Sequence, residues 1–397
     1  MASEYVLSCD FEFLKADEIL PDEDLEANPS LKDDYVVIDT LLENTYLINS
    51  SIYNFLQLFK EPVLLEDVLE RMQIDADDIQ SKEHITSFFD QLREESMIVS
   101  KEENEALKEG QETSDIQEVS VEGYITEEVY KQSFNLWVGL VRRESDMQLV
   151  VVKKFLDDYE VPDEASKDAF IQEFTIMEEI NSHPAICKLY SLNKEKFEAE
   201  IEYVDGGSLR SYIKDKKPPL KKRIELISSL LDGFSFLQQK SVVHGDIHAS
   251  NFMLTKNENL KIIDFGMSNH AGLQNNEIVK RGGVYNYIPP ERVSTEPFQI
   301  VNKKTANFPA EVYQLGLIMY FIFYGKIPFH GLTWQILAKE ICEKIPTLDK
   351  KTGSGEEIPE TIIKILGKAL QKDPLKRYLN ATDLNVAWVQ AIGKMEY

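Results

Sequence analysis

The sequence has few cysteines and no long apolar runs, and its N-terminal part has few basic residues. The three cysteines are far apart and have no cysteine or histidine at metal-ligand spacing, which argues against a disulfide framework or a zinc site. No segment reaches the roughly 18 uncharged apolar residues that a membrane span requires, and the richest apolar run, residues 315–324, predicts a buried helix. The start of the chain also lacks a basic region followed by an apolar one. We therefore expect no secretory signal, no membrane partner and a cytoplasmic protein.

Acidic charge is concentrated at the N-terminus. Residues 1–120 carry 31 acidic and 8 basic side chains, whereas the remainder carries 38 acidic and 35 basic ones. Nucleic-acid phosphates are bound mainly by lysine and arginine, so nucleic acid is not an expected partner. A chain of 397 residues exceeds the size of most single cores, which favours two domains.

The N-terminal part predicts a small winged-helix-like domain over residues 1–99. It contains two β-branched and aromatic runs that predict a short hairpin, three segments with helical periodicity and a last short strand. These segments cover residues 35–38, 46–49, 52–59, 64–72, 84–94 and 97–99. Residues 100–118 are rich in Glu, Lys, Gln and Ser without an apolar period, and they are interpreted as a linker.

The remainder, residues 119–397, predicts an α+β domain with two lobes. Strands are expected over residues 136–141, 149–152 and 198–203, with a helix over roughly 164–180. From about residue 219 the pattern is mainly helical. A small lobe over about 119–203 and a larger one over about 204–397 follow from this order of elements.

The strongest chemical pattern combines two motifs. Residues 243–254 read VHGDIHASNFML, and residues 262–266 read IIDFG. Asp246 and Asn251 are five residues apart in a tight loop and can face one place, where the aspartate accepts a hydroxyl proton and the asparagine binds Mg²⁺. Asp264 would hold the metal that bridges the terminal phosphates. An isolated Asp-Phe-Gly is commonly just a turn after a strand, so the interpretation depends on both motifs together.

These motifs resemble those of the protein kinase family, and the resemblance covers about 270 residues. Lys153 ends a predicted strand and looks like the lysine that pairs with the ATP phosphates, although a lone lysine at a strand end is more often a solvated charge. Glu173 follows 20 residues later in a predicted helix and would orient Lys153, with Glu178 and Glu179 as alternatives. The resemblance implies ATP and Mg²⁺ as cofactors.

The adenine site follows from the same resemblance. Residues 202–209 read EYVDGGSL and look like a kinase hinge. The backbone of Glu202 and Val204 would hold adenine, with the side chain of Ile201 behind it.

Two late segments bear on the substrate class. Residues 283–291 resemble the end of a kinase activation segment, and residues 370–377 resemble the motif whose arginine pairs with its glutamate. A buried pair of Glu291 and Arg377 is therefore expected. Aminoglycoside-type phosphotransferases share a His-Gly-Asp loop, to which His248 adds a likeness, but they lack these two segments. A peptide or protein acceptor is favoured over a small molecule.

Several positions depart from the kinase pattern. Residues 125–134, where a glycine-rich phosphate loop is expected, contain no glycine. Gly245 stands where kinases have an arginine, His248 where they have a lysine, Val284 in place of a threonine and Glu311 in place of an aspartate. A pseudokinase scaffold or docking subunit is the alternative that these departures favour.

Residues 35–99 are similar to PqqD-like peptide-recognition elements of enzymes that modify ribosomally made peptides. The resemblance implies that a leader peptide adds as a strand beside the third strand and packs on the third helix. The implied peptide-binding residues are Thr45, Tyr46, Leu47, Ile48, Asn49, Phe88, Phe89 and Leu92. The alternative for each apolar residue is a place in the core.

Class III and IV lanthipeptide synthetases contain a related kinase domain that phosphorylates Ser and Thr before elimination. The resemblance implies an ATP-dependent Ser/Thr kinase acting on a leader-bearing precursor peptide. Because the chain has no room for a cyclase and only a linker where a lyase might sit, elimination would need a separate lyase as a partner.

Overall fold

The chain forms two compact units, which are described separately. The first consists of residues 1–118 and 332–334, and the second consists of residues 119–331 and 335–397. The computed structural model describes residues 4–8, 11–15, 35–39, 45–48, 50–72, 85–86, 89, 97–101, 104, 119–133, 136–156, 164–271, 287–293, 307–329 and 334–394. Among these residues, no helix has both the length and the apolar character needed to cross a bilayer.

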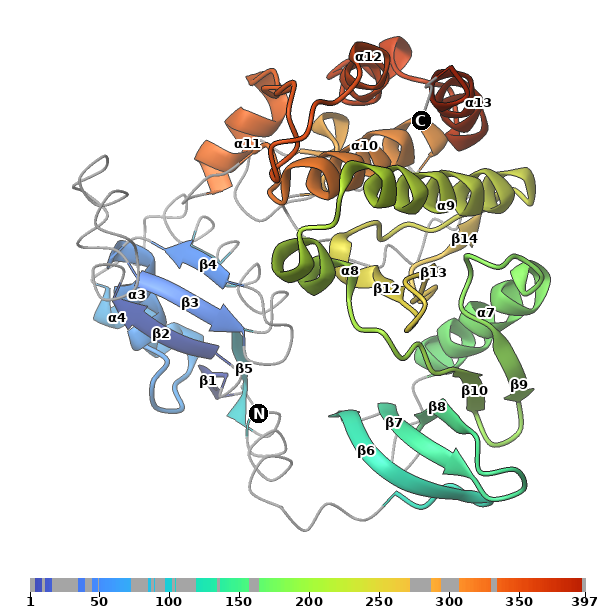
Figure 1. Ribbon diagram of the computed structural model, residues 1–397. Coiled ribbons are helices and arrows are strands. Elements are labelled where there is room, and N and C mark those ends of the chain that lie inside the picture. Colours follow the sequence, from blue (N-terminus) through green and yellow to red (C-terminus); the bar gives the residue numbers. More distant parts are fainter. Residues whose placement is uncertain are drawn as a thin grey trace. The chain divides into compact units, whose positions relative to one another are not determined.

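The first unit contains two small sheets and short helices (Figure 1). Strands β2 (Phe11–Lys15), β3 (Tyr35–Asp39) and β4 (Thr45–Ile48) form an antiparallel sheet in that order, with β4 as an edge strand. This pairing confirms the predicted hairpin over residues 35–49. Strand β1 (Tyr5–Leu7) pairs with β5 (Ile98–Ser100), which closes the unit by joining its two ends.

The helices of this unit bury one apolar face each. Helices α3 (Ser50–Gln57) and α4 (Leu65–Arg71) lie where periodicity predicted them. Helix α3 and the turn after it bury two aromatic rings, Phe55 and Phe59. These rings pack against each other with their centroids 5.5 Å apart. Such aromatic pairs add stability beyond the apolar area that they bury. The core of the unit consists of Val37, Phe55, Leu56, Phe59, Val63, Val68, Phe89, Met97 and Ile98.

The second unit begins with a five-stranded antiparallel sheet in the order β6-β7-β8-β10-β9. Its strands are β6 (Tyr124–Ser133), β7 (Leu136–Arg143), β8 (Leu149–Phe155), β9 (Leu189–Asn193) and β10 (Glu198–Glu202). Helix α7 (Glu164–Ile180) connects β8 to β9. The predicted strands 136–141, 149–152 and 198–203 are confirmed, whereas the long strand β6 was not predicted.

The rest of this unit is mainly helical, with the strands at one end of the unit and these helices at the other (Figure 1). After the one-turn α8 (Leu209–Ser211), the helices are α9 (Leu220–Gln239), α10 (Phe308–Tyr324), α11 (Trp334–Glu343), α12 (Glu360–Ala369) and α13 (Ala381–Ile392). Helix α10 is buried along nearly its whole length, as the apolar run at residues 315–324 predicted. Asn307 caps its start by accepting the N–H of Ala310, and Gly325 ends it with a positive φ.

Two short antiparallel strand pairs, one enclosed by the other in sequence, follow α9 and frame the predicted catalytic residues. Strand β11 (Val242–Val243) pairs with β14 (Asn269–His270), and β12 (Phe252–Leu254) pairs with β13 (Leu260–Ile262). Residues 244–251 and 263–268 are the loops at the ends of these strands. Pairing of the strands therefore fixes both loops in one place.

Candidate active site

Lys153 on β8 and Glu173 on α7 form a bidentate contact. The Lys153 ammonium lies 2.9 Å from Oε1 and 2.8 Å from Oε2 of Glu173. Burial by itself lowers the pKa of Lys153, but the negative charges of Glu173 and Asp264 outweigh this effect and raise it. Lys153 therefore stays charged. Of the three glutamates considered from the sequence, the structure places Glu173 on the lysine, while Glu179 lies 3.3 Å from His270.

Asp264 follows β13 and adopts a left-handed backbone conformation, with a φ of 61°. An aspartate tolerates this conformation better than most residues, but it remains uncommon. Its Oδ1 accepts the N–H of Gly266 at 3.1 Å, so this local bond fixes the carboxylate within the turn. A Cβ atom placed on Gly266 would lie 3.2 Å from Oδ1 of Asp264 and 3.4 Å from Oε2 of Glu173, so the Asp264 carboxylate lies near the Lys153–Glu173 pair.

Asp246 and Asn251 meet across the loop between β11 and β12. The Asn251 amide donates to the Asp246 backbone carbonyl at 2.9 Å and to Oδ2 of the same residue at 3.2 Å. Burial raises the pKa of the Asp246 carboxyl, but hydrogen bonds from His248 and Asn251 and the nearby imidazoles more than offset this and lower it. Asp246 is thus held as a carboxylate, the form that accepts a proton.

The His248 ring contacts this carboxylate. Its Nε2 lies 3.3 Å from Oδ2 of Asp246, and its Nδ1 accepts the backbone N–H of Ser250 at 3.3 Å. Since Nδ1 accepts, the hydrogen-bond network assigns a proton to Nε2, which donates to Asp246. His248 therefore orients the aspartate from the position where kinases have a lysine.

Glu311 on α10 supports the backbone that precedes Asp246. Its Oε1 accepts the N–H groups of His244 at 2.6 Å and Gly245 at 3.2 Å. Its Oε2 accepts the side-chain amide of Gln238 at 2.8 Å. Although Glu311 is longer than the aspartate of the family pattern, its carboxylate thus still binds the backbone of His244 and Gly245.

Gly245 explains another departure from the pattern. Its φ is 83°, and a Cβ atom there would lie 2.5 Å from the carbonyl oxygen of Met267. An arginine at this position would be strained and would collide with that carbonyl. The absence of arginine therefore follows from the close packing of the two loops.

The acidity of Glu311 yields a prediction on stability. Burial raises its pKa to about 7, although the bonds from Gln238, Gly245 and His244 oppose the rise. Between pH 4.5 and 7 the native state then holds a proton that the unfolded state has released, so this contribution to stability falls as pH rises. Between pH 5 and pH 7.5, the free energy of unfolding of wild type should fall by about 2 kcal/mol more than that of Glu311→Gln.

Denaturant titrations followed by tryptophan fluorescence would measure this difference, since all three tryptophans lie after residue 119. Replacement of the exposed Glu225 on α9 by glutamine is the matched control: its free energy of unfolding should change with pH in the same way as that of wild type. If the free energy of unfolding of Glu311→Gln also follows wild type across this pH range, the raised pKa is wrong.

The hinge residues lie at the end of β10. Ile201 pairs with Val151 on β8, and the backbone N–H of Glu202 donates to the carbonyl of Lys188 at 2.8 Å. The Glu202 carbonyl accepts a weak bond from the Cys187 thiol at 3.5 Å. Val204 is buried, and within the described residues no hydrogen bond of its backbone is found. The backbone N–H and C=O of Val204 are thus the groups at the hinge that remain available to an adenine.

Sequence analysis missed the residue that anchors this hinge. The Lys261 ammonium on β13 lies 2.7 Å from Oε2 of Glu202 and 3.3 Å from the carbonyl of Ile186. Lys261 is only 6% exposed. A lysine between two apolar residues of a short strand is the signal that could have indicated a buried ionic partner.

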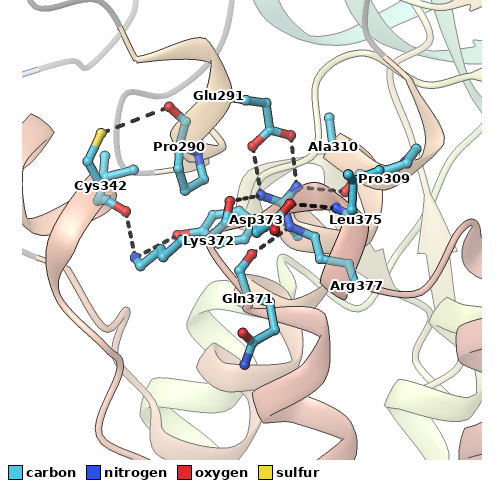
Figure 2. Close-up of polar contacts among 12 residues, drawn as sticks. Pro290, Glu291, Pro309, Ala310, Cys342, Gln371, Lys372, Asp373, Leu375 and Arg377 are labelled. Carbon is cyan, nitrogen blue, oxygen red and sulfur yellow. Dashed lines mark hydrogen bonds and ion pairs between the residues drawn. The ribbon is translucent and has the colours of Figure 1, made fainter.

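The expected pair of Glu291 and Arg377 is present (Figure 2). The two guanidinium NH₂ groups of Arg377 lie 2.8 and 2.7 Å from the two carboxylate oxygens of Glu291. The other three donors of the guanidinium meet the carbonyls of Gln371, Pro309 and Lys372 at 2.7 to 3.0 Å. All five N–H donors are therefore satisfied, and the Arg377 side chain is fully buried. Residues 283–286, including Val284, lie outside the described residues.

The peptide-binding residues inferred for the first unit have different outcomes. Residues 45–48 form β4, the edge strand of its sheet. The ring of Phe89 is 2% exposed and packs on Tyr5 and Phe59, so it belongs to the core, which was the stated alternative. Asn49, Phe88 and Leu92 lie outside the described residues.

Comparisons with known proteins agree with this geometry. The family profile described as "Protein kinase domain" matches residues 137–389. The chain is 29% identical over 217 residues to the serine/threonine-protein kinase PknB of Mycolicibacterium smegmatis, covering 51% of this chain and 32% of that protein. It is 27% identical over 232 residues to PrkC of Bacillus subtilis, covering 56% and 34%. It is 30% identical over 214 residues to the protein kinase kin1 of Schizosaccharomyces pombe, covering 52% and 22%.

The matched region is therefore between 22% and 34% of the length of these three relatives. The profile nevertheless covers more than half of this chain, from β7 to α13, and includes Lys153, Asp246 and Asp264. By its sequence and by the arrangement of these residues, the chain belongs to the protein kinase family.

Proposed function

We propose that the chain is an ATP- and Mg²⁺-dependent kinase that phosphorylates Ser or Thr in a peptide or protein. The observation that carries this proposal is the joint presence of the Lys153–Glu173 ion pair and the Asp246–Asn251 loop. Phosphoryl transfer depends mainly on positioning and charge neutralisation, which these groups provide. The Ser/Thr kinases PknB and PrkC among its relatives support this acceptor class.

The donor atoms fit ATP and Mg²⁺. The Asn251 amide nitrogen is used within the loop, which leaves its Oδ1 for a metal. Oδ1 of Asp264 accepts an N–H, while its Oδ2 remains for the same purpose. Magnesium prefers such oxygen ligands, and when bound with ATP it neutralises the charge of the terminal phosphates. Lys153 would hold the phosphates, and Asp246 would orient the acceptor hydroxyl and take its proton.

The first unit would recruit the acceptor. Within the described residues β4 pairs only with β3, so one side of it has no strand partner. An extended peptide can add to such an edge by main-chain hydrogen bonds. The proposed substrate is a ribosomally made precursor whose leader binds there, as in the PqqD-like winged-helix elements. The excess of acidic residues in this unit favours a leader with basic residues.

In this proposal the kinase works in the cytoplasm, where precursor peptides and ATP are available. It belongs to a peptide-modification system in which a separate lyase eliminates the phosphate. The resemblance to lanthipeptide synthetases supports this role.

One observation favours a second candidate, a pseudokinase scaffold or docking subunit of such a system. Strand β6 runs to Ser133 without a glycine where kinases have a glycine-rich loop. A scaffold would bind the peptide without transferring phosphate.

Incubation of the full chain with MgATP and peptides separates the two candidates. We expect a leader-bearing, Ser/Thr-containing precursor to gain the mass of phosphate by mass spectrometry, and the same peptide without its leader to react at least about tenfold more slowly. Equal rates with and without the leader would refute recruitment by the first unit. Binding of the peptide without any phosphorylation, across the precursors tested, would favour the scaffold.

A further inference from the structure

Strand pairing arranges the face of the sheet that carries Lys153 in rows. One row contains Ile201, Val151, Leu140 and Glu128. Because the hinge follows directly after Ile201 in the chain, this row is the one nearest the adenine position. The next row lies farther from the hinge and contains Ala199, Lys153, Val138 and Lys131. Residues directly opposite one another in paired strands point to the same face. Two lysines, Lys131 and Lys153, therefore share one row on this face, with one strand between them.

A β-bulge places Lys131 on this face. In an unbulged strand, Lys131 would share the face of Val129, two residues earlier, and Val129 lies opposite Gly139 on the other face of the sheet. The register shifts between Val129 and Lys131, so the extra residue Tyr130 turns Lys131 toward the face of Lys153. Bulges of this kind are common next to active sites, where they re-aim a side chain.

Burial raises the pKa of the Tyr130 hydroxyl to about 12, and the nearby hydroxyl of Tyr203, the residue between Glu202 and Val204, adds to this rise. The bulge residue therefore lies near the hinge, while the strand register sets the position of Lys131 on the sheet.

The Lys131 side chain is available for a ligand. It is exposed, and no ion pair of its ammonium group is found among the described residues. Lys153, in contrast, is already paired with Glu173. In glycine-rich loops the backbone amides cover the phosphates, but β6 has no glycine and stays paired with β7 up to Ser133.

From this arrangement we infer that Lys131 is a second triphosphate-binding cation, which takes over the phosphate contact that a glycine-rich loop makes through backbone amides. The inference rests on the proposed use of ATP. Glu128 lies one row nearer the hinge, so its negative charge opposes phosphates at the adenine end and favours them at the row of the two lysines. Lys131 binds the nucleotide and takes no proton from the acceptor.

The test compares dissociation constants for MgATP and adenosine, measured by competition on the full chain. Their ratio reports the contribution of the phosphates and cancels general damage to the adenine site. For Lys131→Gln we expect the MgATP constant to rise about tenfold and the adenosine constant to stay within about twofold. Lys131→Arg should restore most of the affinity for MgATP.

Lys154→Gln is the matched control, because Lys154 lies opposite Trp137 on the other face of the same sheet. Its ratio should equal that of wild type. An unchanged ratio in Lys131→Gln, or an equal loss for both ligands, would overturn the role of Lys131. If wild type binds neither ligand, the proposed kinase function fails first, and this inference falls with it.

Discussion

Replacement of Asp246 by asparagine should abolish phosphate transfer while the fold stays intact. The side chain keeps its shape and can still accept the bond from His248 or from Asn251, but it can no longer take the proton of the acceptor. A positioned general base contributes about 10²–10⁴-fold, so the rate should fall by a factor in this range. Transfer of labelled phosphate to a peptide, with thermal unfolding of the same sample, would measure both effects.

The matched control is Asp215→Asn, at an exposed aspartate in the turn after α8. It should leave both the rate and the unfolding midpoint unchanged. Full activity of Asp246→Asn would refute the assignment of Asp246. A large drop in its unfolding midpoint would instead mean that the carboxylate is needed for the fold.

Removal of the Arg377 side chain should produce the largest loss of stability. The Arg377→Met variant leaves the mostly buried carboxylate of Glu291 without its cation, and it leaves three backbone carbonyls without their donor. Breaking a buried pair by removing one partner typically costs about 3–5 kcal/mol. Denaturant titration followed by tryptophan fluorescence would measure this cost.

A double-mutant cycle separates the charge from the carbonyl contacts. Glu291→Met leaves Arg377 with its three carbonyls but without its anion, while the double variant leaves no buried charge. We expect the double variant to lose clearly less stability than the sum of the two single losses. Because the carbonyls stay unsatisfied, it should still be less stable than wild type. Strictly additive losses would show that the ion pair contributes nothing.

The sequence predicted those parts of the fold that local patterns determine. The burial of α10 follows from an unbroken apolar run, and the β3–β4 hairpin follows from two β-branched and aromatic runs close together. The position of Glu173 depends on the helical phase of α7. It could be preferred over Glu178 and Glu179 only through the family resemblance, because all three lie in one helix.

Other parts of the site could not be predicted, since they depend on contacts between distant segments. Strand β6 was expected to hold a loop, and its bulges have no pattern that a single sequence reveals. The need for glycine at Gly245 comes from the carbonyl of Met267, which belongs to another loop. The anchoring of Glu202 by Lys261 joins residues 59 positions apart, beyond the reach of any periodicity.

Gly206 has a consequence for motion. Its N–H donates to the carbonyl of Leu254, the N–H of Leu254 donates to the carbonyl of Gly207, and a Cβ at Gly206 would collide with the backbone of Leu254 and Thr255. The end of the hinge is therefore held by hydrogen bonds to β12, the strand that follows the catalytic loop. A rotation of the small lobe relative to the large lobe would therefore have to pivot at residues before Gly206, because the residues from Gly206 onward and strand β12 would move as one rigid body.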